Sequence, residues 1–387
     1  MPDNKHWDSK SIFVNKIALT YKIAFLMLHS TKGGGNMRVN LFRAFLCVFL
    51  LATLCLCVGC LPQPKPESME EYITVLTYNT HLFQGSREEF GGLRRKEILD
   101  DKQRAEKMLY KIAESHADIV ALQEVWADGN QEWFCQSMKP LYPYCAVSGQ
   151  KEDWEDFSKK MRYLNTCGLV LLSKYKFIEK PGFYEFDRSA FKWWKLEELQ
   201  ERLARKGVIT ATVELEPGGP KLRLGITHTH YGKGQEELNV QELANKTIIK
   251  NGSVIDSPAI IMGDFNIHAI IDKGSYGRLI NNFAKLNAVD AYREVHPCDN
   301  EERMSEDDYT IDGQKNELHK KFFPSSKTRD RIDYVFVKKS GGGLELTPVE
   351  AEVLHDWKYE AVWNKRADLS DHYPVKVKFK VTRTTTP

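Results

Sequence analysis

The chain carries no excess of either charge, no internal repeat and no low-complexity block. Its 55 lysines and arginines nearly cancel its 53 aspartates and glutamates, which leaves a formal net charge of +2. This balance excludes a generally basic protein that coats nucleic acid, although a local basic patch is compatible with it. The length of 387 residues suits one large α/β domain or two small ones.

Cysteine is scarce outside one apolar segment, where four of the eight cysteines lie between residues 47 and 60. The other four are scattered along the chain: Cys135, Cys145, Cys167 and Cys298. No Cys-x-x-Cys pair is followed by a second such pair, so the spacing of a thiolate metal site is absent. In an oxidising compartment Cys135 and Cys145 could bridge a short loop. Four free and mostly buried thiols are the alternative.

Long apolar runs are absent except in an N-terminal segment that is typical of a secretory leader. Arg38 and Arg43 supply positive charge before an apolar run over residues 44–58. Gly59 then precedes Cys60. A leader needs an apolar run of about 7–15 residues, whereas a membrane-spanning helix needs about 20. Residues 37–60 therefore predict a signal peptide with a lipobox-like ending, in which Cys60 is lipidated. The alternative is an uncleaved signal anchor, because Leu61 extends the apolar run.

The flanking segments agree with an exported, membrane-anchored protein that resembles a bacterial lipoprotein. Residues 61–71 begin with alternating prolines and predict a stiff tether. Residues 1–36 fit no leader, and the glycine codons just before Met37 could spell a ribosome-binding site. We therefore expect translation to begin at Met37, with residues 1–36 a misannotated extension. Residues 382–387 are expected to form a tail, and residues 72–381 a domain outside the cytoplasm.

Strand-like and helical patterns alternate through this domain. Strands are predicted at residues 73–78, 119–122, 168–172, 208–215, 222–226, 259–262, 332–337 and 375–379, and helices at residues 94–113, 238–249 and 276–286. Because the helices are inserted at irregular intervals, the pattern favours an α/β or α+β sandwich over a regular βαβ barrel.

Polar side chains suited to metal binding or proton transfer lie at the ends of the predicted strands. They occur in segments 77–81 (TYNTH), 118–125 (DIVALQEV), 225–230 (GITHTH), 260–266 (IIMGDFN), 331–335 (RIDYV) and 369–375 (LSDHYPV). Carboxylates and amides are hard oxygen ligands that suit Mg²⁺, and histidines with carboxylate partners suit acid–base catalysis. A single strand-end Asp or Asn is more often a turn residue, so the prediction depends on the whole set.

In this order the segments resemble the endonuclease/exonuclease/phosphatase superfamily, which includes DNase I, abasic-site endonucleases, inositol polyphosphate 5-phosphatases and neutral sphingomyelinases. The resemblance covers nearly everything from Ile73 to Lys380. It implies a DNase I-like fold, in which two mixed β-sheets flanked by helices form a four-layer sandwich. It also implies hydrolysis of a phosphodiester with Mg²⁺ or another divalent cation such as Mn²⁺.

The resemblance further implies roles for individual residues at the metal. Glu124 is expected to be the principal metal ligand, with Asn79 beside it. Asp371 is expected to lie next to the metal. A metal at this position would neutralise the negative charge that develops during phosphodiester hydrolysis.

Five more residues are implied to carry out the chemical step. Asp264 and Asn266 are expected to orient the attacking water and a phosphate oxygen. His228 is expected to stabilise charge on the phosphorus centre. His372 is expected to act as the general base, oriented by Asp333, because a carboxylate can hold a neutral imidazole in one tautomer.

Shorter motifs resemble those of sphingomyelinases in particular. Segment 263–268 (GDFNIH) and the paired His228 and His230 resemble the neutral enzymes, as does segment 290–294 (DAYRE). Segment 310–316 (TIDGQKN) resembles the Thr-x-Asp-x-x-x-Asn of the bacterial enzymes. These matches imply hydrolysis of sphingomyelin to ceramide and phosphocholine. A phospholipid membrane is therefore the expected partner, and no protein partner can be inferred.

Residues 183–195 depart from this pattern with a dense aromatic and basic stretch. Phe191, Trp193 and Trp194 are candidates for contact with a lipid interface, where such rings lie at headgroup level. The alternative is that half of the rings belong to the core and the others cover the edge of a sheet.

Two other functions remain open besides lipid hydrolysis. A secreted or surface nuclease would use the same metal site, but it favours Arg and Lys on both sides of its cleft. The near-neutral charge of the chain argues against that function. A catalytically silent binding module has no chemical need for the complete set from Asn79 to His372.

Overall fold

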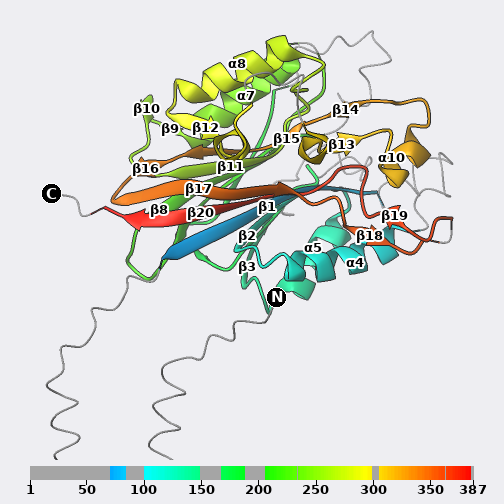
Figure 1. The fold of residues 1–387 in the computed structure, drawn as a ribbon. Helices are drawn as coiled ribbons and strands as arrows, with labels where there is room; N and C mark the ends of the chain where they lie inside the picture. The colour runs from blue at the N-terminus through cyan, green and yellow to red at the C-terminus, as the bar shows by residue number, and fades with distance from the viewer. Residues whose placement is uncertain are drawn as a thin grey trace, which may run out of the picture. The chain divides into compact units, whose positions relative to one another are not determined.

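The computed structural model describes residues 70–83, 100–148, 167–187, 205–232, 234–298, 305–361 and 363–384. These residues form a sandwich of two seven-stranded sheets with helices on both outer faces (Figure 1). The four-layer arrangement predicted from the sequence is therefore confirmed.

The first sheet has the order β16-β17-β20-β1-β2-β4-β3. Its strands are β16 (Ser340–Gly341), β17 (Leu344–Val353), β20 (Val375–Arg383), β1 (Glu71–Leu82), β2 (Ile119–Val125), β4 (Val170–Ser173) and β3 (Tyr144–Val147). The strands β1 and β2 pair in parallel, and the other neighbours pair antiparallel.

The second sheet has the order β12-β15-β11-β8-β7-β5, and β6 also pairs with β7. Its strands are β12 (Ala288–Asp290), β15 (Asp333–Lys338), β11 (Ala259–Asp264), β8 (Lys221–His228), β7 (Gly207–Glu214), β5 (Lys176–Phe177) and β6 (Gly182–Glu185). Here β8 and β11 form the parallel pair. Each sheet therefore has one parallel pair near its centre, which places the carboxyl ends of those two strands side by side.

Helices and small hairpins complete the domain. The helices are α4 (Asp101–Glu114), α5 (Asp128–Met138), α7 (Gln235–Thr247), α8 (Lys273–Ala284), α9 (Ala291–Val295), α10 (Glu317–Phe322) and the 3₁₀ helix η5 (Glu306–Asp308). The two-stranded pairs are β9 (Ile249–Lys250) with β10 (Ser253–Val254), β13 (Ile311–Asp312) with β14 (Arg329–Asp330), and β18 (Lys358–Tyr359) with β19 (Ala367–Asp368).

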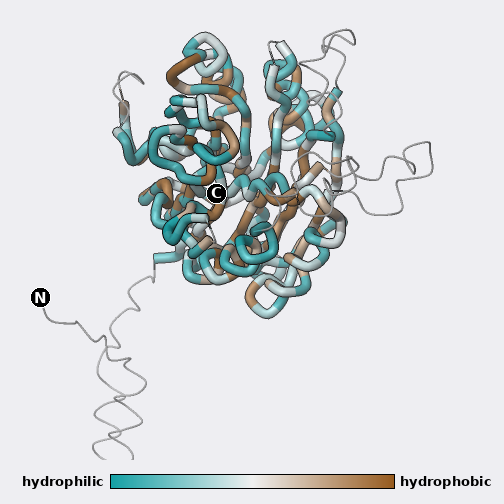
Figure 2. The backbone as a smooth tube through the Cα atoms, turned by 90° about the vertical axis from the view of Figure 1, so that its right-hand side faces the viewer, coloured by the Kyte–Doolittle hydropathy of each residue, from teal (hydrophilic) through white to brown (hydrophobic). Residues whose placement is uncertain are grey.

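Successive side chains along a strand alternate between the core that lies between the two sheets and the outer layers. On β1, Ile73 and Val75 pack in the core between the sheets, whereas Leu76 and Tyr78 pack toward α4 and α5. This follows from the two-residue period of a strand. On the opposite outer face, apolar residues of α7 and α8 pack against the second sheet. Figure 2 shows apolar segments alternating with hydrophilic ones along the backbone of this domain.

The predicted central strands are present, and their ends agree with the structure to within a few residues. The strand β17 was not predicted, because Pro348 and several charged residues obscure its alternation. Its register with β20 shifts between Pro348 and Glu350, which is where a proline is tolerated in a sheet. The helix α5 was also missed. The predicted helix 94–113 is described from Asp101, and residues 94–99 lie outside the described part.

Candidate metal and catalytic site

The strand-end segments singled out in the sequence converge at one end of the sandwich. The parallel strands β1, β2, β8 and β11 all end there, and the antiparallel strands β15 and β20 begin there. In the second sheet Asp264 pairs with both His228 and Asp333 across the strands. The polar residues brought to this end are Asn79, Glu124, His228, Asp264, Asp333, Asp371 and His372.

Three residues of this edge have a left-handed backbone. The φ angles are 50° for His81, 58° for Glu124 and 50° for Asn266. This conformation is costly for residues other than glycine and is concentrated at functional sites. Gly168 packs directly on Glu124, and a Cβ there would lie 3.1 Å from the Cα of Glu124. The fold therefore holds the Glu124 backbone where a regular strand would not.

His372 and Asp333 form a buried hydrogen-bonded pair. The distance from His372 Nδ1 to Asp333 Oδ2 is 2.9 Å. This contact leaves Nε2 of His372 directed at the site, 3.8 Å from Asp264 Oδ2. Burial alone would lower the pKa of His372, but Asp333 and then Asp264 outweigh it and raise the pKa. A histidine held in this way presents one defined ring nitrogen to a reactant.

The segment that begins at Thr310 supports this pair from behind. The Thr310 hydroxyl accepts hydrogen bonds from the backbone N–H groups of Ile332 and Asp333, at 3.0 and 3.3 Å. Asn316 donates from Nδ2 to the carbonyl of Ser370 at 3.0 Å. The sphingomyelinase-like motif of residues 310–316 thus lies against the backbone that carries Asp333 and His372.

Asp264 lies at the centre of the site. Asn79 donates from Nδ2 to Asp264 Oδ2 at 2.9 Å, and the backbone N–H of Asn266 donates to Asp264 Oδ1 at 2.8 Å. His228 Nε2 lies 3.5 Å from Asp264 Oδ2. Burial, followed by the charge of Asp333, raises the pKa of Asp264 above its ordinary value. Asp264 therefore connects the predicted metal side of the site with the His372 side.

His81 lies between two of the predicted metal-site carboxylates. Its Nδ1 is 3.5 Å from Glu124 Oε2 and 3.3 Å from Asp371 Oδ1. The rings of Phe83 and Phe322 pack on it, with centroid distances of 4.7 and 4.5 Å. The sequence segment TYNTH contained His81 but gave no reason to assign it a role, because its contacts are with residues far along the chain.

The pKa values of Glu124 and His228 are both lowered, but for different reasons. Burial alone would raise the pKa of Glu124, but the nearby His81 outweighs it, so the pKa is lowered and the group is a carboxylate. Burial, followed by the charge of Lys206, lowers the pKa of His228 well below its ordinary value. His228 is therefore a neutral imidazole, able to donate one N–H to a negatively charged group.

The donor set fits a divalent cation. Glu124 Oε2 and Asp333 Oδ1 are buried and have no hydrogen-bond partner in the part of the chain that the structure describes, although buried carboxylate oxygens normally have one. Within the described residues, Asp264, Asp333 and His372 offer ligand atoms within 4.8 Å of one another. Such a concentration of buried carboxylates is costly without a cation, and oxygen ligands suit Mg²⁺ or Mn²⁺.

Arg104 is a buried positioning residue that the sequence did not reveal. Its guanidinium donates to the carbonyls of Thr80, His81 and Leu369 at 3.1, 2.6 and 2.7 Å. It thereby ties the end of β1 to the segment that precedes Asp371. In the sequence it is one of many charged residues on a helical pattern, and only the folded contacts distinguish it.

Several residues of the sphingomyelinase-like motifs have structural partners. His230 Nδ1 lies 3.0 Å from Asn239 Oδ1 on α7. His268 Nδ1 lies 3.1 Å from Asp330 Oδ2. Asp290 caps α9 through its side chain and binds the buried Arg331. These contacts explain the residues as parts of the scaffold around the site.

Some predicted residues lie outside the described part of the chain. They are the lipidation residue Cys60 and the membrane-contact residues Phe191, Trp193 and Trp194. At the start of the aromatic stretch, Phe186 is buried in the core, whereas Tyr184 is 40% exposed. Among the described helices, none has the length and apolar character that a membrane crossing requires.

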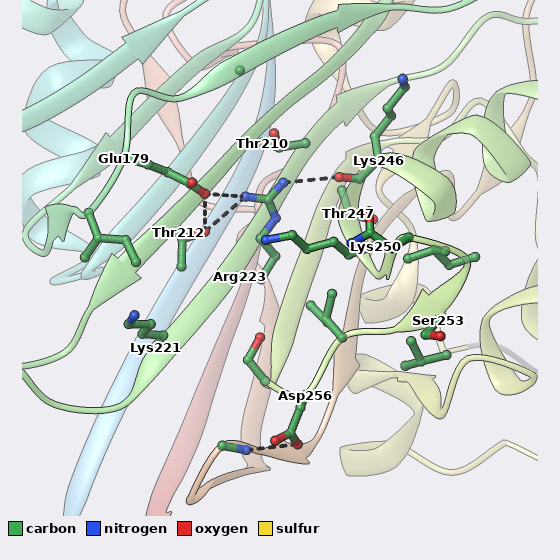
Figure 3. A pocket seen from close by; sticks show the side chains of 18 of the residues that line it. Glu179, Thr210, Thr212, Lys221, Arg223, Lys246, Thr247, Lys250, Ser253 and Asp256 are labelled. Carbon is green, nitrogen blue, oxygen red and sulfur yellow. Dashed lines mark hydrogen bonds and ion pairs between the residues drawn. The ribbon is translucent and has the colours of Figure 1, made fainter.

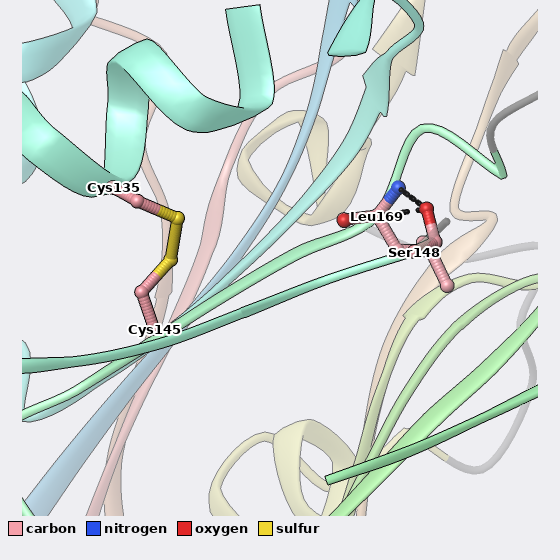
Figure 4. Close-up of a disulfide and its surroundings, with 4 residues drawn as sticks. All are labelled: Cys135, Cys145, Ser148 and Leu169. Carbon is pink, nitrogen blue, oxygen red and sulfur yellow. Dashed lines mark hydrogen bonds between the residues drawn. A yellow bond between two sulfur atoms is a disulfide. The ribbon is translucent and has the colours of Figure 1, made fainter. Parts of the chain in front are cut away.

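A disulfide joins Cys135 of α5 to Cys145 of β3, so this pair is bridged rather than free (Figure 4). The two residues are separated by 10 positions, and closing a loop of that size stabilises a fold by about 2–3 kcal/mol in the chain-entropy model. The bond fastens an outer helix to the edge of the first sheet, away from the carboxylates of the site.

Known proteins share this fold and its sequence pattern. The model of the endonuclease/exonuclease/phosphatase family matches residues 76–372. The CCR4-Not complex 3'-5'-exoribonuclease subunit Ccr4 of Mycosarcoma maydis is 23% identical over 368 residues, which cover 82% of this chain and 52% of that protein. This chain therefore spans about half the length of that relative.

Two solved structures illustrate the likeness in fold. Sphingomyelinase C from Streptomyces griseocarneus superimposes with a TM-score of 0.54 at 19% identity, covering 80% of this chain and 99% of that one. The beta toxin of Staphylococcus aureus with bound magnesium ions gives a TM-score of 0.56 at 18% identity, covering 81% and 100%. With the family match over most of the described domain, these findings show that the chain belongs to the endonuclease/exonuclease/phosphatase family of metal-using hydrolases.

Proposed function

We propose that the protein is a divalent-metal-dependent phosphodiesterase that hydrolyses sphingomyelin to ceramide and phosphocholine. The observation that carries the proposal is the meeting of two units at one end of the sandwich. One unit is the carboxylate pair Glu124 and Asp371, and the other is the hydrogen-bonded pair His372 and Asp333. A cation site beside a positioned imidazole is what water attack on a phosphodiester requires.

In this proposal His372 is the general base. Asp333 occupies Nδ1, so in the deprotonated imidazole Nε2 is the atom that would accept the proton of the attacking water. Asp264 lies 3.8 Å from that nitrogen and would orient the same water together with Asn266. His228, which is neutral and buried, would donate to an oxygen of the phosphorus centre.

Glu124 and Asp371, with Asn79 beside them, would hold the cation. When bound, a divalent cation would supply positive charge that offsets the charge developing on the phosphorus centre. We assign it to this side because the 2.9 Å contact of His372 with Asp333 is already a hydrogen bond. His81 contacts both carboxylates and would position them.

The choice of sphingomyelin is supported by the short motifs at residues 263–268, 290–294 and 310–316, which resemble those of sphingomyelinases. A solved sphingomyelinase C also shares the fold. These motifs contact the scaffold of the domain. They therefore support sphingomyelin as the substrate through their resemblance to sphingomyelinases. Membrane contact by Phe191, Trp193 and Trp194 belongs to the same proposal.

A nuclease is the second candidate, because the sequence relative that covers most of this chain is an exoribonuclease subunit. Two assays separate the candidates. One measures phosphocholine released from sphingomyelin in mixed micelles, and the other measures cleavage of plasmid DNA and of single-stranded RNA. Each is run with Mg²⁺ and again with excess chelator.

The proposal expects chelator-sensitive phosphocholine release at a rate far above nucleic-acid cleavage. If only DNA or RNA were cleaved, the substrate would be nucleic acid instead of sphingomyelin, and the metal-dependent mechanism would still hold. Activity on none of the three would favour a silent binding module. Glu124→Gln serves as the matched inactive control in all assays, since it keeps the shape of the side chain and removes its charge.

A further inference from the structure

A second, separate cleft lies on the outer face of the second sheet, beside the carboxyl end of α7. It has a volume of about 1020 Å³ and is bordered by β5 to β8, the end of α7 and the hairpin of β9 and β10 (Figure 3). Its volume is at the upper end of the range for small-molecule sites. The cleft is therefore large enough for a ligand rather than a single ion.

The lining of the cleft is predominantly cationic. Its charged side chains are Lys180, Lys221, Arg223, Lys246, Lys250, Glu179 and Asp256. Five cations against two carboxylates leave an excess of three positive charges. Hydroxyl groups of threonine and serine residues also line it. An excess of cations together with neutral donors favours a multiply charged oxyanion.

Both carboxylates are already engaged by protein groups. Glu179 accepts hydrogen bonds from Arg223 at 3.1 Å and from the Thr212 hydroxyl at 2.8 Å. Asp256 accepts one from the backbone N–H of Gly342 at 3.3 Å. In contrast, Lys221 and Lys250 have no ion-pair partner among the described residues. Lys221 and Lys250 therefore carry two of the positive charges of the cleft without a carboxylate partner in the described part of the chain.

Arg223 lies at the base of the cleft between the two lysines (Figure 3). It is half-buried, and its guanidinium also donates to the Thr212 hydroxyl at 3.0 Å and to the carbonyl of Lys246 at 3.2 Å. Figure 3 shows the Lys250 side chain extending across the cleft toward Arg223. Lys246 turns instead to the ring of Tyr184, 4.5 Å from its centroid. The cleft thus has at its base a cation held by three hydrogen-bond partners, with lysine amines around it.

This cleft is distinct from the candidate catalytic site. Arg223 precedes His228 by five residues on β8, which corresponds to roughly 17 Å along a strand. The two also point to opposite faces, because His228 shares its parity with Leu224, which packs between the sheets. A ligand in the cleft would therefore not contact Glu124 or His372.

We propose that this cleft binds a ligand that carries a phosphate group. The excess of three charges matches a doubly charged phosphate with one cation to spare, and the lining hydroxyls of Thr210, Ser253 and Ser257 offer neutral donors to its remaining oxygens. A soluble phosphorylated molecule and an anionic lipid headgroup offer the same chemistry. The proposal does not depend on the activity of the catalytic site.

The experiment measures binding by the full chain in the presence of chelator, so that no metal can bridge phosphate to the catalytic carboxylates. One arm titrates inorganic pyrophosphate by calorimetry at low and at moderate ionic strength. The other arm measures cosedimentation with phosphatidylcholine vesicles, with and without added phosphatidic acid, whose headgroup is a phosphate monoester. The quantity compared in that arm is the increase in binding that the anionic lipid causes.

The test variant is the double substitution Lys221→Glu with Lys250→Glu. A second variant, Lys221→Gln with Lys250→Gln, removes the charges without reversing them. The matched control, Lys107→Glu with Lys139→Glu, reverses two exposed lysines on the opposite outer layer. Melting temperatures of all variants show whether each is folded, and the rate on a soluble phosphodiester is expected to stay unchanged.

We expect wild-type binding in at least one arm, weaker at higher salt, and a loss of about tenfold or more in the charge-reversed variant, with a smaller loss in the neutral one. Loss in the pyrophosphate arm identifies a soluble ligand, and loss only in the vesicle arm identifies a headgroup. The proposal is overturned if wild type binds in neither arm, or if the control variant loses as much as the test variant.

Discussion

His372 and Asp333 show at the scale of single residues how the fold prepares an acid–base group. The carboxylate fixes one ring nitrogen, and the strand β15 fixes the carboxylate. We predict that His372→Ala lowers the turnover number by about 10²–10⁴-fold, the usual range for a lost general base. Metal binding is expected to stay nearly unchanged, because the ring contacts Asp333 and not Glu124.

Steady-state kinetics with the preferred substrate check this prediction, with His268→Ala as the control, since His268 pairs with Asp330 outside the proposed reacting groups. If the His372 variant kept more than about a tenth of wild-type activity, the assignment of the base would be wrong.

His81 gives a second prediction at this scale. Because its ring contacts both Glu124 and Asp371, His81→Asn is expected to weaken divalent-metal affinity by about 10–100-fold, as for other residues that orient metal ligands. Saturating metal should restore most of the turnover. Titration of Mn²⁺ followed by electron paramagnetic resonance measures the affinity directly. A variant with a lower melting temperature but unchanged Mn²⁺ affinity would show that His81 is only a packing residue.

The sequence predicted the polar residues that belong to strand-end motifs and missed those that act on them. Asp264 and Asp333 end or begin buried strands, and this position makes them visible as a pattern. Arg104 and His81 act through contacts with Leu369 and Asp371, more than 250 positions away. No local pattern marks such contacts, because they exist only after the strands β1 and β20 have paired.

At the scale of elements, the segment around β13 lies outside the two main sheets and contacts the start of β15, the strand that carries Asp333. Thr310 accepts two backbone hydrogen bonds from Ile332 and Asp333. We predict that Thr310→Val destabilises the fold by about 1–3 kcal/mol, because it leaves buried N–H donors without a partner. It should also lower turnover, because Asp333 loses its support.

Urea unfolding and steady-state kinetics measure the two effects, and Thr310→Ser, which restores the hydroxyl, is the control. If the valine variant were destabilised but fully active, Thr310 would not be needed to position Asp333.

Strand prediction succeeded where apolar residues alternate, as in β8, or form a continuous buried run, as in β11. It failed for β17, where Pro348 and charged residues interrupt the pattern on a strand near the edge of its sheet. The register shift at Pro348 accommodates the missing N–H through pairing with β20. Sequence alone could not supply this partner, so the strand was not recognised.

For the whole molecule, we propose export and attachment to a membrane through Cys60, as the N-terminal sequence predicts. We predict that Cys60→Ser abolishes lipid labelling in a bacterial host, because the lipobox-like ending assigns the acyl chain to the Cys60 thiol. Metabolic labelling with a radioactive fatty acid, combined with membrane fractionation, checks this. An unlabelled wild-type protein that remains in the membrane fraction would instead support an uncleaved signal anchor.

The four-layer arrangement was predicted correctly, since the alternation of strands and the order of the motifs both reflect the same sandwich. Each sheet contains one parallel pair of strands, and these two pairs bring Glu124 and Asp264 to the same end of the sandwich. The outer cleft near Arg223 was not predicted, because its lysines come from separate elements and share no motif.

The central claim is that Glu124 and Asp371 hold a divalent cation beside His372. The most direct measurement is a calorimetric titration of the metal-free protein with Mn²⁺ and Mg²⁺, paired with the same titration of Glu124→Gln. The account predicts saturable binding by the wild type, an increase in melting temperature on saturation, and a loss of at least about tenfold in affinity for the variant. Equal affinity of the two proteins would contradict it.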